Sequence, residues 1–160
     1  MQWLLDLINK RVILTIPESC SYSVCLQLQL QESRLLLSMV KTFFLVLLIM
    51  LYVFAGINHF WHPAFYLRLI PRYLPNHALV NMIAGGAELV FGIMLIFPRL
   101  RKWAAYGIIA MLVAFIPSHV YSISLAGCST NEWCTPLAIS WVRLFVIHPF
   151  LIAWAWWFRK

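Results

Sequence analysis

The hydrophobic and polar positions divide the chain into four long apolar segments, separated by short polar or proline-containing stretches. A helix needs about 20 mainly apolar residues to cross a bilayer, and each segment is close to that length. The segments cover residues 40–57, 78–97, 103–125 and 137–158. The pattern therefore predicts an all-α fold, an integral membrane four-helix bundle formed by residues 39–160.

Residues 1–38 lack such a pattern. Residues 12–16 are apolar but too few to span, and residues 26–31 alternate leucine with glutamine, which is a weak strand-like pattern. Asp6 and the absence of a long apolar core argue against a cleaved signal peptide. We expect residues 1–38 to be a poorly structured extension, or an artefact of a start codon placed too early, because Met39 directly precedes the first apolar segment.

The stretch between the first two segments, residues 58–77, is rich in aromatic, histidine and proline residues. Aromatic side chains such as Trp61 and Tyr73 favour the interface between lipid and water. Pro63 and Pro71 would interrupt a long helix. The stretch is therefore predicted to hold one short helix at the membrane surface.

Composition strengthens the membrane prediction. The 160 residues are 63% hydrophobic and 11% charged, which is more apolar than soluble domains are. A net charge of +7 would suggest nucleic-acid binding in a soluble protein, but here the basic residues flank apolar segments. We take the membrane to be the plasma (inner) membrane, and by the positive-inside rule we expect both termini in the cytoplasm. The lipid bilayer is then the expected partner, and nucleic acid is not.

The second apolar segment carries Glu88 near its middle. A carboxyl group there is costly unless it faces other helices or water. Asn81, Gly85, Glu88 and Gly92 follow one another at spacings of three or four, so they lie on one helix face. Small residues allow close helix approach, and we therefore predict that this face packs against another helix.

Glu88 and Arg143 are the acid and the base inside the predicted segments, so we expect them to pair. At 1.5 Å per residue, Glu88 lies about 15 Å and Arg143 about 9 Å below the outer surface. Two interpretations stay open. The pair holds two helices in register, or it belongs to a site for a polar ligand, a quinone headgroup or a proton.

Histidines extend this predicted polar cluster. His59 ends the first segment, His119 lies about 9 Å deep and His148 about 16 Å deep. His119 and His148 are each either a hydrogen-bonded packing residue or a group with a ligand-binding or proton-relay role. A depth difference of about 7 Å between His119 and His148 argues against haem ligation. The four cysteines include no CxxC pair, so no metal site is predicted.

Cys128 and Cys134 share the predicted outer loop between the third and fourth segments. In an oxidising compartment they would form a disulfide, and otherwise they are two free thiols. Both interpretations stay open.

Three stretches resemble the DoxX-like family of small four-helix membrane proteins. They are AGINHFWHPAFYLRLIPRYLP, GGAELVFGIMLIFPRLRKWAAYGI and WVRLFVIHPFLIAWAWWF, within residues 40–158. Matching features include His59-Phe60, Gly85 with Glu88, and Arg143. The family pattern of Ala-Asn after the third-segment proline is replaced by Ser118-His119. Where the family pattern has a proline and a glutamine shortly after the last-segment arginine, this chain has Phe145 and Ile147. The resemblance implies the fold. Some members of the family resemble a subunit of a thiosulfate:quinone oxidoreductase, and others are linked to oxidative-stress defence. Distant relatives act as membrane assembly factors.

We therefore expect a non-catalytic membrane component or assembly factor that binds a lipid-like molecule. The alternative is a quinone-linked membrane redox subunit, in which Glu88 takes protons and Arg143 or His148 holds the headgroup. No flavin, haem or iron–sulfur motif is present, so electrons would need a redox partner protein. A transporter would need a homo-oligomer, because four helices are few for that function.

Overall fold

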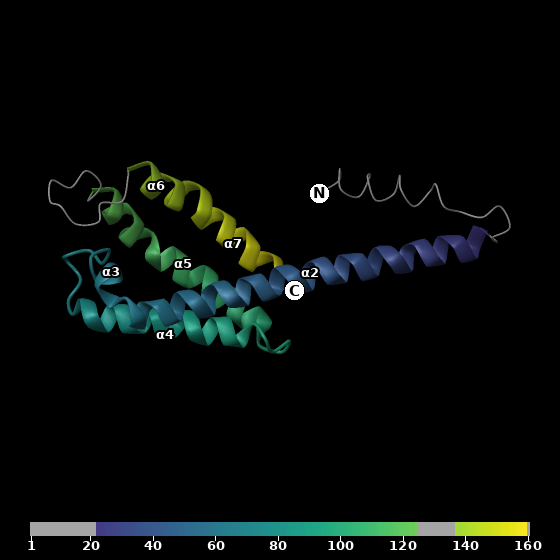
Figure 1. Ribbon diagram of the computed structural model, residues 1–160, viewed down its shortest axis with the longest axis horizontal. Coiled ribbons are helices and arrows are strands. Elements are labelled where there is room, and N and C mark those ends of the chain that lie inside the picture. The colour runs from purple at the N-terminus through teal and green to yellow at the C-terminus, as the bar shows by residue number, and fades with distance from the viewer. Residues whose placement is uncertain (1–21, 125–136, 160) are drawn as a thin grey trace. The chain divides into compact units, whose positions relative to one another are not determined.

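The structure is a computed structural model that describes residues 22–124 and 137–159 (Figure 1). In these ranges the chain is helical and contains no strand. The helices are α2 (Tyr22–Trp61), α3 (Pro63–Leu67), α4 (His77–Met94), α5 (Arg101–Ser124), α6 (Leu137–Val142), the π-helix η1 (Arg143–Ile147) and α7 (His148–Trp157). The chain divides into two units, Met1–Phe44 and Leu45–Lys160, and the division falls within α2.

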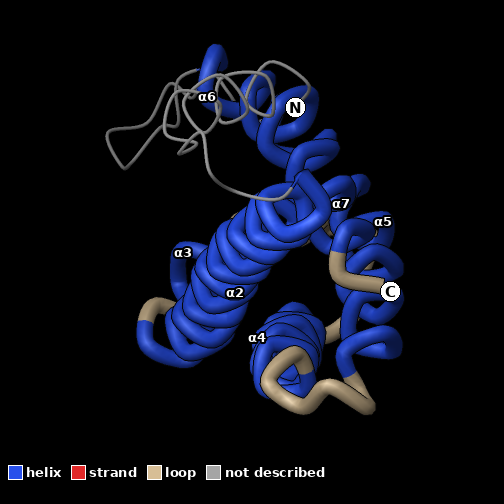
Figure 2. Tube along the Cα trace, turned by 90° about the vertical axis from the view of Figure 1, so that its right-hand side faces the viewer, coloured by secondary structure: helices blue, strands red, loops and turns tan. Residues whose placement is uncertain are grey.

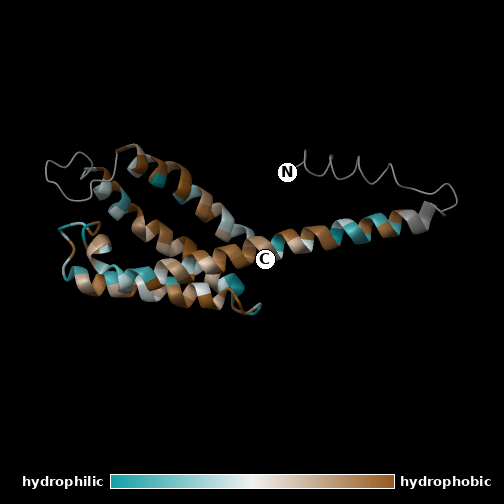
Figure 3. Ribbon diagram, viewed as in Figure 1, coloured by the Kyte–Doolittle hydropathy of each residue, from teal (hydrophilic) through white to brown (hydrophobic). Residues whose placement is uncertain are grey.

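Four stretches are long and apolar enough to span a membrane. They are Leu26–Trp61, His77–Met94, Arg101–Ser124 and Leu137–Trp157. Figure 3 shows many apolar residues along the helices of the Leu45–Lys160 unit. The predicted all-α bundle is confirmed, and the chain is a membrane protein.

The first helix begins earlier than expected. Residues 22–38 belong to α2, so the prediction of a poorly structured segment was wrong for this part, and the strand-like pattern at 26–31 was misleading. Leucine, glutamine, glutamate and arginine dominate here, and all are good helix formers. A helix that is already formed in the apolar segment extends easily into such a sequence. Residues 1–21 lie outside the described part.

The connection between α2 and α4 contains the predicted short helix, α3, which begins at Pro63. Proline is favoured at this first helical position because no hydrogen bond is lost there. Asn76 then caps α4. Its backbone adopts a left-handed conformation with φ 50°, and its side-chain oxygen accepts a hydrogen bond from the Leu79 N–H.

Glycines bring α4 close to the Leu45–Trp61 part of α2. A Cβ on Gly85 would lie 2.5 Å from the His59 Cβ, and one on Gly56 would lie 2.9 Å from the Gly85 carbonyl oxygen. A Cβ on Gly92 would lie 3.2 Å from the Tyr52 Cβ. The predicted close approach of a helix to the glycine face of α4 is confirmed, and that helix is α2.

Helix α5 contacts both α4 and α7 within the Leu45–Lys160 unit (Figure 2). The Phe91 ring of α4 lies where a Cβ on Gly107 of α5 would be, so a larger residue at 107 would displace this ring. Leu48, Leu95, Ile108 and Phe158 are among the largest fully buried side chains. Many other apolar side chains are exposed, as expected for a surface that faces lipid.

The last predicted helix is interrupted by a π turn. The His148 N–H donates to the Arg143 carbonyl, five residues earlier, instead of to the residue four earlier. Pro149 follows immediately and has no N–H, and its ring would clash with a carbonyl one turn back. The π turn therefore lies directly before a proline.

Candidate functional site

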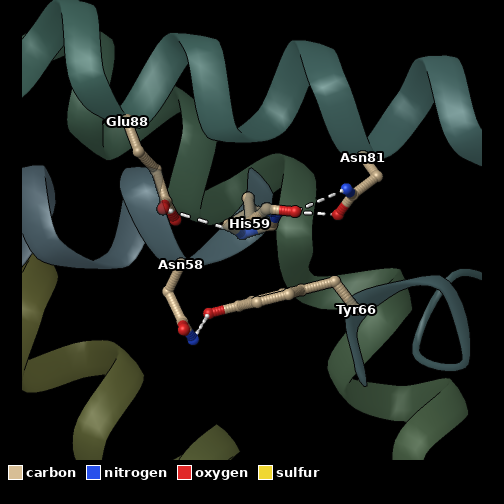
Figure 4. Close-up of polar contacts among 5 residues, drawn as sticks. All are labelled: Asn58, His59, Tyr66, Asn81 and Glu88. Atoms are coloured by element: carbon tan, nitrogen blue, oxygen red, sulfur yellow. Dashed lines mark hydrogen bonds and ion pairs between the residues drawn. The ribbon is translucent and has the colours of Figure 1, made fainter. Parts of the chain in front are cut away.

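Three buried side chains from α2 and α4 form the centre of the candidate site (Figure 4). The His59 Nε2 lies 3.6 Å from the Glu88 Oε2. The His59 Nδ1 is 2.8 Å from the Asn81 Oδ1, and the Asn81 Nδ2 donates to the His59 carbonyl oxygen at 3.0 Å. Asn81 therefore holds both the ring and the backbone of His59, and directs the other ring nitrogen at Glu88.

The Asn81 amide determines the tautomer of His59. A carbonyl oxygen only accepts, so the Asn81 Nδ2 must face the His59 carbonyl. The Asn81 Oδ1 then faces the His59 Nδ1, which must carry a hydrogen to donate. A neutral His59 consequently presents the lone pair of its Nε2 to Glu88.

A second layer of contacts supports the ring of His59 from α3. The Tyr66 ring stacks on the His59 ring, with centroids 3.6 Å apart and an interplanar angle of 25°. The Asn58 Nδ2 donates to the Tyr66 hydroxyl at 2.8 Å (Figure 4). The Asn58 Oδ1 in turn accepts from the His62 Nδ1 at 2.8 Å. These contacts join α3 to the end of α2 and restrict rotation of His59.

Two buried polar atoms, one on α2 and one on α4, have no hydrogen bond in the structure. They are the Glu88 Oε2 and the Tyr52 hydroxyl, in residues that are 7% and 2% exposed. A Cβ on Gly92, about one turn after Glu88 on α4, would lie 3.2 Å from the Tyr52 Cβ, so Tyr52 and Glu88 lie at the same contact between α2 and α4. Buried polar atoms are nearly always hydrogen-bonded, so such a pair indicates a place where water or a ligand group binds. We name Tyr52, His59, Asn81 and Glu88 the Glu88 cluster.

The predicted face of α4 is confirmed residue by residue, because Asn81, Gly85, Glu88 and Gly92 are the buried residues of that helix. The predicted partner of Glu88 was wrong. Glu88 contacts His59, whereas Arg143 interacts electrostatically with His119. Helix periodicity shows which residues share a face, but it does not show which neighbouring helix that face meets.

Arg143, His119 and His148 form a second group, between α5 and the helix that contains η1 and α7. The His119 and His148 rings meet edge to face, with centroids 4.7 Å apart. The expected depth difference between them was therefore wrong, since a count of residues takes no account of helix tilt or of the π turn. The His148 Nε2 donates to the Leu112 carbonyl at 2.7 Å, which links the two helices and uses that nitrogen.

Cys128 and Cys134 lie outside the described residues, so their pairing stays a prediction. Among the residues that are described, no group of three or more histidine, cysteine, aspartate or glutamate side chains could hold a metal ion. The side chains of the Glu88 cluster offer hydrogen bonding and proton exchange.

Tyr52 was not predicted as a member of the cluster. Its position carried a signal, because Tyr52, Gly56 and His59 are spaced by four and three residues and so share a face of α2. Tyr66 lies on α3, a helix separate from α2, so its stacking on His59 could not be derived from residue spacing.

Residues 48–159 match a protein family that is described as a domain of unknown function, DUF8561. The chain belongs to this family. The matched region includes the end of α2 and all of α3 to α7, and therefore every residue of the Glu88 cluster. No curated protein and no solved structure was found to match the chain.

Proposed function

We propose that the protein is a non-catalytic membrane component or assembly factor whose Glu88 cluster binds the headgroup of a lipid-like molecule. The observation that carries this proposal is the pair of buried polar atoms without a hydrogen bond, the Glu88 Oε2 and the Tyr52 hydroxyl. Leaving such atoms unsatisfied costs about 1–3 kcal/mol each. A ligand that hydrogen-bonds to both would remove this cost.

The remaining contacts of the cluster favour binding over chemistry. Asn81, Tyr66 and the helix backbones hold His59 in one orientation, so the site is prepared before a ligand arrives. The ligand would approach from the lipid, where many apolar side chains of the protein are exposed. These side chains also offer a surface for a membrane partner protein or for a second copy of the chain.

Membrane topology and ancestry form part of the same proposal. We propose that both termini face the cytoplasm across a plasma (inner) membrane, because Lys41, Arg99, Arg101, Lys102 and Arg159 lie at the ends of apolar segments assigned to that side. We also propose kinship with the DoxX-like family. The motifs that support it include His59, Gly85 and Glu88, and these three residues are neighbours in the fold.

The binding proposal is tested by mass spectrometry of molecules that co-purify in mild detergent with the wild type and with Glu88→Gln. This substitution keeps the size of the side chain, and its new amide can donate to the His59 Nε2, so we expect the variant to fold. Glu32→Gln, at an exposed position of α2, is the matched control. We expect a lipid-like molecule with the wild type and the control but not with Glu88→Gln. An equal set of molecules in all three folded proteins would refute the proposal.

A quinone-linked redox subunit is the second candidate. It is favoured by the position of His59 next to Glu88, since this pair can hold a proton that quinone reduction needs. Arg143 and His148 lie in the second group, so the headgroup would be held by the Glu88 cluster instead. This function predicts that Glu88→Gln abolishes quinone reduction in membranes that contain normal amounts of protein. Unchanged quinone reduction would exclude it.

A further inference from the structure

We infer that the Glu88 cluster selects an uncharged headgroup that carries an oxygen able to hydrogen-bond, such as a hydroxyl, and rejects a phosphate. This inference rests on the proposed binding function and adds the chemical class of the ligand. It follows from the number of protons that the His59–Glu88 pair must hold.

The first step concerns that proton. The Asn81 amide requires a hydrogen on the His59 Nδ1, so a neutral His59 turns the lone pair of Nε2 toward the Glu88 Oε2, 3.6 Å away. An ionised Glu88 beside a neutral His59 would place two electron pairs face to face in a buried site. One proton between the two groups removes this repulsion, either on the Glu88 carboxyl or on the His59 Nε2.

The second step concerns net charge. A protonated Glu88 with a neutral His59 has no net charge, and neither does an ionised Glu88 with a protonated His59. The pair is therefore neutral wherever the proton lies. Among the described residues the ion-pair contact of Glu88 is with His59 and not with Arg143, so Arg143 is not counted in this pair.

The third step concerns the ligand. A phosphate that entered this cluster would be a buried charge without a counter-charge from the His59–Glu88 pair, which is strongly unfavourable. A neutral hydroxyl both donates and accepts, and so it matches the two groups that have no hydrogen bond. The Tyr52 hydroxyl can donate to it, and the Glu88 Oε2 can accept from it.

The test measures binding of two probes to the full chain in nanodiscs. The probes are diacylglycerol and phosphatidic acid with identical acyl chains, so they differ only in the phosphate. We expect the wild type to bind diacylglycerol about tenfold or more tightly than phosphatidic acid. Tyr52→Phe should reduce the affinity for diacylglycerol by about tenfold, since it removes one hydrogen bond.

Tyr52→Phe is suited to this test because the hydroxyl it removes has no hydrogen bond in the structure, so folding does not depend on it. Tyr106→Phe, at an exposed position of α5, is the matched control and should bind diacylglycerol like the wild type. Circular dichroism and size exclusion establish that each variant is folded.

Each outcome separates this inference from the proposed function. Equal binding of both probes, or preference for phosphatidic acid, would overturn the selection for a neutral headgroup and leave lipid binding intact. Binding of diacylglycerol that Tyr52→Phe does not weaken would place the ligand elsewhere and overturn the inference. Binding of neither probe by folded protein would overturn the inference, while co-purification of a different lipid-like molecule would still decide the proposed function.

Discussion

The two helix interfaces that contain buried histidines differ in what each histidine does. At the interface of α2 and α4, His59 contacts side chains, namely those of Asn81, Glu88 and Tyr66. At the interface of α5 and α7, His148 donates to a backbone carbonyl, that of Leu112. The first interface leaves two polar atoms available, whereas the second uses its histidine to connect helices.

The backbone explains this difference. Gly56, Gly85 and Gly92 allow α2 and α4 to approach so closely that polar side chains from both helices meet. In α5 the ring of Pro117 removes a backbone donor, and the Val113 carbonyl loses its usual partner. The Leu112 carbonyl that accepts from His148 belongs to the residue next to Val113. Buried histidines therefore belong to a candidate binding site at the α2–α4 interface and to a structural link at the α5–α7 interface.

The largest expected effect breaks the α2–α4 interface itself. Gly85→Ala places a Cβ 2.5 Å from the His59 Cβ, and the two helices must separate. We expect a loss of about 3 kcal/mol in the free energy of unfolding, at the upper end of typical overpacking costs. Gly86→Ala is the control, because nothing lies within 4 Å of its Cβ. Thermal unfolding in mild detergent measures both, and equal midpoints would contradict the proposed close contact.

A smaller effect is expected at the α5–α7 interface. His148→Phe keeps an aromatic ring but leaves the buried Leu112 carbonyl without this donor. The free energy of unfolding should fall by about 1–2 kcal/mol, and ligand binding at the Glu88 cluster should not change. His119→Phe retains a ring beside His148 and should cost less. If His119→Phe destabilises the protein as much as His148→Phe does, the hydrogen bond to Leu112 is not the important contact.

The smallest effect sharpens the description of the Glu88 cluster. Tyr66→Phe preserves the ring that stacks on His59 and removes only the hydroxyl that accepts from Asn58. We expect Tyr66→Phe to lower the free energy of unfolding by about 1 kcal/mol. Tyr66→Leu also removes the stacking and should lower the unfolding temperature further. Equal effects of the two substitutions would show that stacking contributes nothing.

The sequence by itself determined the elements and the faces of this protein. The length of the apolar segments predicted four spanning helices, and these are present. The helical period placed Asn81, Gly85, Glu88 and Gly92 on one face, which is the buried face of α4. Both features are local, because they depend on residues within one turn or one segment.

Only the tertiary structure decided which groups meet. Glu88 was expected to pair with Arg143, but the rotation and neighbours of each helix bring His59 to it instead. His119 and His148 were expected at different depths, and their rings are in contact. The length of α2 and the π turn before Pro149 were not predicted either. Charge and periodicity define which side chains lie on each helix face. The close packing of all the helices determines which of these side chains contact one another.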